Sequence, residues 1–74
     1  MEDLTLPQQN TFNAIKDFIN QYGYSPTVRE LCALTGKSSP GTIEQHIKIL
    51  KAKKYIDYIY NHNRTIRIIK KEEK

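Results

Sequence analysis

Three helix-start signals divide this chain and constrain its fold more than any other feature. Thr5–Gln8 and Thr27–Glu30 both have the capping-box spacing, in which a threonine and the residue three positions later satisfy free backbone N–H groups reciprocally. Ser39–Pro40 places a capping serine before a proline, whose fixed φ suits the first position of a helix. The chain therefore begins with three predicted helices.

Apolar residues recur at helical spacing after each signal, which gives each predicted helix one buried face. The first helix ends before Gly23, the second before Gly36, and the third near Lys53. The residues predicted to be buried are Phe12, Ile15, Ile19 and Tyr22 in the first, Val28, Leu31 and Leu34 in the second, and Ile43, Ile47 and Leu50 in the third. This assignment turns the polar side chains of the third helix toward water or a ligand.

Beyond the third helix the apolar period changes to two, which is the period of a strand. Ile56, Tyr58 and Tyr60 alternate with other residues in one run, and Ile66 and Ile68 do so in the next. Residues 61–64 between the runs carry two asparagines, which tolerate positive φ. The sequence predicts a mainly α fold with a small antiparallel β-hairpin: a three-helix winged helix-turn-helix over residues 1–69, with a charged tail at 70–74.

The charge of this chain is segregated. With 74 residues it is one small domain, which excludes a multi-domain enzyme. Residues 1–36 carry two basic and four acidic side chains, a net of −2, whereas residues 37–74 carry ten basic and four acidic ones, a net of +6. A segregated basic half can steer a polyanion.

The lone Cys32, with no signal peptide and no long apolar run, predicts a cytoplasmic protein without a membrane segment.

The sequence shows no pattern typical of a catalytic site or a metal site. Ser39 has a structural explanation as a helix cap, and nothing places His46 beside it with an orienting group. Cys32, His46 and His62 are spaced 14 and 16 residues apart, without the short chelating pair that zinc sites favour. We therefore predict no enzyme activity, no cofactor and no metal. Cys32 is expected in or beside the core, and His46 either packs there or contacts a phosphate.

The predicted arrangement favours binding to duplex DNA. In a winged helix-turn-helix, the third helix is free to enter the major groove with its N-terminal turns. Thr42, Glu44 and Gln45 lie on its exposed face, and their side chains suit contacts to thymine, cytosine and adenine respectively. Because winged helices also dock on proteins, an interaction module that modulates a host repressor or polymerase remains the alternative.

The chain also resembles the N-terminal DNA-binding domain of LexA-type SOS repressors over residues 4–69. The residues that carry the resemblance are Leu4-Thr5, Gln8-Gln9, Phe12, Ile15, Gly23–Glu30, Gly36, Ser38-Ser39-Pro40, Thr42-Ile43, His46-Ile47, Leu50 and Thr65-Ile66-Arg67. The Pro-Thr-x-Arg-Glu turn and the Ser-Pro segment with its following histidine are the most specific elements. The resemblance implies a sequence-specific transcriptional regulator of double-stranded DNA, a LexA-like repressor module.

By this resemblance, the positions that face operator bases are Ser39, Gly41, Thr42, Glu44 and Gln45, and the loop at residues 61–64 is the wing that reaches the DNA backbone. The residues predicted to contact the backbone are Lys37, Ser38, Lys48, Lys51, Lys53, Arg64 and Arg67. Members of the family usually continue into a self-cleaving Ser/Lys peptidase domain, which we expect this chain to lack. A monomer is expected in isolation, with pairing on a palindromic operator as the remaining option.

Overall fold

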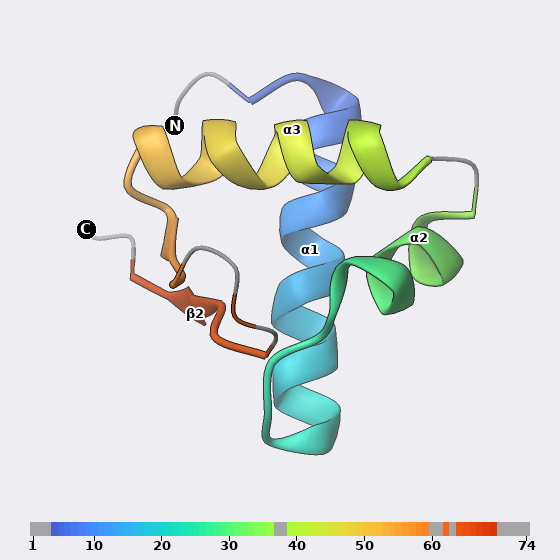
Figure 1. Cartoon of the computed structure of the whole chain (residues 1–74), viewed down its shortest axis with the longest axis vertical. Coiled ribbons are helices and arrows are strands. Elements are labelled where there is room, and N and C mark those ends of the chain that lie inside the picture. Colours follow the sequence, from blue (N-terminus) through green and yellow to red (C-terminus); the bar gives the residue numbers. More distant parts are fainter. Residues whose placement is uncertain (1–3, 37–38, 60–61, 63, 70–74) are drawn as a thin grey trace.

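A computed structural model describes residues 4–36, 39–59, 62 and 64–69 of the chain. These residues form three helices, α1 (Leu6–Tyr22), α2 (Val28–Thr35) and α3 (Pro40–Ala52), followed by the strands β1 (Ile56–Asp57) and β2 (Arg67–Ile68) (Figure 1). α1 contacts both other helices, and α3 also contacts β1. The two strands pair antiparallel. The predicted fold class, mainly α with a small antiparallel hairpin, is confirmed.

The helices begin at the predicted caps. The hydroxyl of Thr5 accepts the backbone N–H of Gln8 at 3.3 Å, and the Gln8 side chain accepts the Thr5 N–H at 3.0 Å. Thr27 and Glu30 repeat this reciprocal pair at 3.2 and 2.8 Å. Ser39 caps α3 with its side-chain oxygen. The three capping signals in the sequence therefore set where each helix starts.

One apolar cluster joins the helices to the hairpin. Its buried members are Ile15, Leu31, Ile43, Ile47, Leu50, Ile56 and Ile66. The predicted buried face of α3 is confirmed, because Ile43, Ile47 and Leu50 all belong to this cluster.

Two residues predicted to be buried are exposed instead. Tyr22 is 51% exposed, and Phe18, at 8% exposed, is buried in α1 in its place. Tyr22 lies in the last turn of α1, where its ring contacts that of Phe18 at a tilt of 47°, with centroids 4.5 Å apart. Leu34 is 54% exposed, although Leu31 in the same helix is fully buried. Both predictions were wrong because helical spacing alone does not show which residues near the end of a helix have a packing partner.

The hairpin ladder is shorter than predicted: Ile56 pairs with Ile68 and Asp57 with Arg67, and beside them the Ile69 N–H donates to the Tyr55 carbonyl at 2.9 Å. A side chain takes the backbone group that would extend it, since Thr65 Oγ1 accepts the N–H of Ile59 at 3.0 Å. The N–H of Ile66 faces away from β1 in this register, and Ser25 Oγ accepts it at 3.1 Å. Tyr60 and both loop asparagines lie outside the described residues; of those described in the loop, Arg64 has a positive φ of 58°.

A buried polar contact links α1 to α3. His46 Nδ1 lies 2.8 Å from Thr11 Oγ1, and both residues are buried. Thr11 Oγ1 also donates to the carbonyl of Pro7 at 3.2 Å. Of the two roles considered for His46, packing in the interior is the one that the structure supports. Separately, none of the described helices is both long and apolar enough to span a lipid bilayer.

The variant Thr11→Val should lower the free energy of unfolding by about 1 to 3 kcal/mol, because it leaves the buried His46 nitrogen without its partner. Urea denaturation followed by circular dichroism measures this loss. Replacing both partners, as in Thr11→Val with His46→Leu, should recover most of it, since no buried polar group then lacks a hydrogen bond. A double variant less stable than Thr11→Val would show that Thr11 and His46 stabilise the fold through packing and not through their hydrogen bond.

Candidate nucleic-acid interface

The exposed face of α3 is polar along its first three turns. Ile43, Ile47 and Leu50 anchor the opposite side in the core and so fix the rotation of the helix about its axis. All residues predicted to face bases are exposed, namely Ser39, Gly41, Thr42, Glu44 and Gln45. The structure therefore brings this predicted set together on one accessible surface.

The start of α3 is held by its cap and leaves open space beside it. Ser39 Oγ accepts the backbone N–H of Thr42 at 3.3 Å and donates to Thr42 Oγ1 at 3.1 Å. A Cβ atom added at Gly41 would meet, beyond its chain neighbours and the adjacent helix backbone, no atom of the described residues within 4 Å. This end of the helix can therefore be approached closely by a large ligand.

A groove of about 360 Å³ is lined by residues of both α3 and the hairpin. Glu44 and Lys48 line it from the helix, and Ile59 and His62 line it from the hairpin. Ile59 is 59% exposed, so it adds an apolar edge beside the charged helix face. The helix and the hairpin thus form two sides of one concave surface.

The basic residues predicted to contact a DNA backbone differ in their partners. Lys48, Lys51, Lys53, Arg64 and Arg67 are all exposed, but only Lys51 and Arg64 form an ion pair with another described residue. Lys51 is paired with Asp57 at 3.1 Å, and it also donates to the carbonyl of Tyr58 at 3.2 Å. The hydrogen bond from Lys51, together with one from the Tyr58 N–H, holds the pKa of Asp57 below its ordinary value. Lys37 and Ser38, also predicted to contact the backbone, lie outside the described residues.

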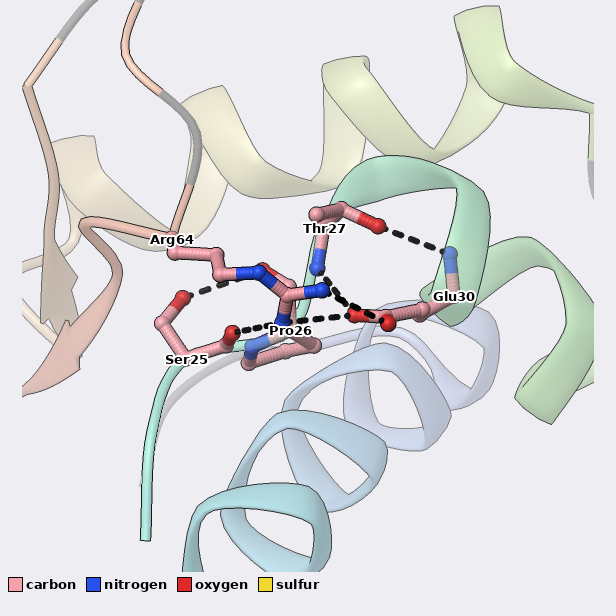
Figure 2. Close-up of polar contacts among 5 residues, drawn as sticks. All are labelled: Ser25, Pro26, Thr27, Glu30 and Arg64. Carbon is pink, nitrogen blue, oxygen red and sulfur yellow. Dashed lines mark hydrogen bonds and ion pairs between the residues drawn. The ribbon is translucent and has the colours of Figure 1, made fainter. Parts of the chain in front are cut away.

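Arg64 makes contacts within the protein (Figure 2). Its Nη1 and Nη2 lie 3.2 and 3.0 Å from the two carboxylate oxygens of Glu30, and Nη1 donates to the carbonyl of Ser25 at 3.1 Å. Its guanidinium carbon lies 4.9 Å from the centre of the Tyr24 ring. Hydrogen bonds from the Thr27 N–H and then from Arg64 lower the pKa of Glu30. The DNA-backbone contact stays a prediction for Arg64, whose guanidinium already has these partners.

Comparison with known proteins identifies the family of this fold and surface. The family model of the LexA DNA binding domain matches residues 1–65 of the chain. The chain belongs to the LexA DNA-binding domain family. It is 46% identical over 70 residues to a LexA repressor of Desulfatibacillum aliphaticivorans. The aligned residues make up 95% of this chain and 34% of that protein.

A LexA repressor of Erwinia tasmaniensis is 38% identical over 73 residues, which is 99% of this chain and 36% of that protein. The chain thus spans about a third of the length of the two LexA repressors it matches. The resemblance to LexA-type repressors predicted from the sequence is confirmed.

The other candidate residues have structural roles in this LexA-type domain. Cys32 is half-buried against the core, as predicted. In the part of the chain that the structure describes, no group of three or more His, Cys, Asp or Glu side chains could hold a metal ion. His46 is hydrogen-bonded to Thr11 in the interior, whereas His62 is exposed and lines the groove between α3 and the hairpin.

Sequence reasoning missed Ser25 and Glu30 as residues that bind the hairpin. The capping-box spacing predicts Glu30 only as the partner of Thr27, and that contact is present. The Glu30 carboxylate has a second oxygen that the cap does not use, so a further hydrogen-bond donor could be expected beside Glu30. No local pattern indicates that this donor is Arg64, 34 residues away.

Proposed function

We propose that this LexA-type domain binds double-stranded DNA sequence-specifically and serves as the DNA-binding module of a transcriptional repressor. The observation that carries the proposal is the exposed polar face of α3, whose rotation is fixed by three buried apolar residues on the opposite side. A helix of this kind fits the major groove, where base edges are distinguishable.

The residues on this face have the chemistry that base edges require. Gln45 can make two hydrogen bonds to adenine, Glu44 can accept from the amino group of cytosine, and the Thr42 methyl can contact the methyl of thymine. Ser39 and Gly41 complete the proposed base-facing set at the start of the helix. Their open surroundings support a close approach of the helix to the groove floor.

Backbone contacts would come from the basic half of the chain. We assign them to Lys48, Lys53 and Arg67, which are exposed, and to Lys37 and Ser38 just before the cap of α3. Such contacts orient the domain on the duplex but carry no sequence information. Lys51 and Arg64 are ranked behind these residues, because each is already paired with a carboxylate.

The relatives are named as repressors, and we extend that role to this chain. We propose a monomer in the absence of DNA and a cytoplasmic location, where the chromosomal partner would be found. Two copies would bind a palindromic operator better than one only if they contact each other on the DNA, since without contact no free energy couples the half-sites.

The variant Gln45→Ala should lose about 1 to 3 kcal/mol of affinity for a duplex selected by the wild type from a random pool, because one two-contact base pairing is lost. Its affinity for a scrambled duplex should stay nearly unchanged. Titration of both duplexes by fluorescence anisotropy measures the two losses separately.

The matched control is Gln21→Ala, which removes an exposed glutamine from the C-terminal end of α1, away from the proposed interface. It should bind both duplexes as the wild type does. An equal loss on both duplexes for Gln45→Ala would contradict base reading by α3 and would favour a docking role for this surface.

A further inference from the structure

The hairpin is held to the helices by more than its own strand pairing. Its ladder consists of two residue pairs, Ile56 with Ile68 and Asp57 with Arg67. A two-stranded hairpin is marginally stable in water even when it is longer than this. Other contacts must therefore fix where the far end of the hairpin lies relative to α3.

Those contacts meet at the turn before α2 (Figure 2). Arg64 reaches from the hairpin and forms a two-point ion pair with Glu30, while its Nη1 also donates to the carbonyl of Ser25. The next contact along the hairpin is the N–H of Ile66, which Ser25 Oγ accepts at 3.1 Å. Ser25 is buried, so this side of the hairpin is bound at two adjacent points to one turn.

The geometry of the Arg64 contact is suited to fixing the position of the hairpin. The guanidinium presents two parallel N–H bonds to both oxygens of one carboxylate, a fork that a lysine cannot reproduce. The Tyr24 ring lies on one face of the same guanidinium. Arg64 adopts its positive φ of 58°, a region that non-glycine residues rarely occupy, and these contacts favour that conformation.

We propose that Glu30 and Arg64 form a latch that positions the wing for DNA binding and that neither residue acts by contacting DNA. The inference rests on the proposed function, since the wing must contribute to the interface for its position to matter. The latch joins the first turn of α2, which packs against α3, to the hairpin across the groove from Glu44 and Lys48. Releasing it would separate the two sides of the concave surface.

The latch and simple electrostatics predict opposite changes in DNA affinity when the charge of Glu30 is removed. Removing the negative charge of Glu30 near a polyanion should strengthen binding if charge alone matters, and it should also free Arg64 for a phosphate. A latch predicts weaker binding instead. Glu30→Gln is the suitable variant, because Gln8 performs the same capping role in α1 and the cap of α2 should therefore survive.

The experiment compares Glu30→Gln, Arg64→Lys and the double variant on the selected duplex, at a temperature where circular dichroism shows each to be folded. Each single variant should bind about fivefold more weakly or worse, a typical size for coupling between sites. The double variant should lose no more than the worse single variant, because both changes break the same contact. The control Asp17→Asn removes an exposed carboxylate from α1 and should not weaken binding.

Two further readouts separate a latch from a phosphate contact. The salt dependence of binding by Arg64→Ala should keep the slope of the wild type, whereas loss of a phosphate contact would reduce the slope by about 0.9. Hydrogen exchange at the Ile66 amide should accelerate in Glu30→Gln, while amides within α3 keep their protection. Wild-type affinity in Arg64→Lys, or equal or tighter binding by Glu30→Gln, would overturn the latch.

Failure of the proposed function would look different. If the wild-type chain showed no affinity for any duplex, the DNA role would be wrong for every variant alike. Exchange at Ile66 would then still decide whether Glu30 and Arg64 position the hairpin: acceleration in Glu30→Gln would support that part, and unchanged exchange would refute it.

Discussion

Raising the salt concentration from about 50 to about 200 mM should weaken binding of the wild-type chain to duplex DNA by about 150-fold, because four neutralised phosphates give a slope of about −3.6 in log affinity against log salt. The four cations in this expectation are Lys37, Lys48, Lys53 and Arg67. Each one that neutralises a phosphate releases condensed counterions, and salt opposes that release. Anisotropy titrations at five or more salt concentrations measure the slope.

The same slope tests which cations take part. If Lys51 and Arg64 also contacted phosphates, six neutralised charges would give a slope of about −5.4, and the same change in salt would cost about 1,800-fold in affinity. Binding that hardly changed with salt would contradict the assignment of the basic half of the chain to the DNA backbone. Lys48→Ala provides the internal control, since it should reduce the slope by about 0.9.

The variant Leu50→Ala should lose about 2 to 5 kcal/mol of unfolding free energy, the usual cost of deleting a buried leucine side chain. Leu50 is fully buried in the cluster that joins α3 to the hairpin. A domain of this size gains only about 3 to 5 kcal/mol from its core, so the variant should be largely unfolded at room temperature. Thermal and urea denaturation followed by circular dichroism measure the loss.

Leu34→Ala is the matched control, because it makes the same substitution at a position that is 54% exposed. It should lose less than about 1 kcal/mol, as surface substitutions usually do. Similar losses for the two leucine variants would mean that the buried face of α3 is assigned incorrectly, and with it the face that we propose to read bases.

Local signals in the sequence were enough to predict the helices. The caps at Thr5, Thr27 and Ser39 involve residues within three positions, so they could be identified without knowing the fold. The apolar spacing of α3 predicted its buried face, and therefore the exposure of Thr42, Glu44 and Gln45, because a helix has one fixed period. The candidate base-reading surface follows from these local rules.

Contacts between distant residues could not be predicted in the same way. Arg64 was assigned to a DNA backbone because it lies in a loop and is basic, but its partners Ser25 and Glu30 lie 39 and 34 residues earlier. The Thr65 hydroxyl takes the Ile59 N–H in place of a ladder partner, and the Ser25 hydroxyl binds the outer edge of the hairpin at Ile66; no alternation of apolar residues reveals either contact. Tyr22 and Leu34 were misassigned for a related reason, since burial near a helix end depends on the neighbouring element.

Base reading by α3 is tested most directly by the affinity of the wild-type chain for two duplexes. One duplex is selected by the chain from a random pool, and the other has the same length and base composition in scrambled order. Because a single good base pairing is worth about 1 to 3 kcal/mol, we expect the selected duplex to bind at least about tenfold more tightly at the same salt concentration. Equal affinity for the two duplexes would contradict the claim.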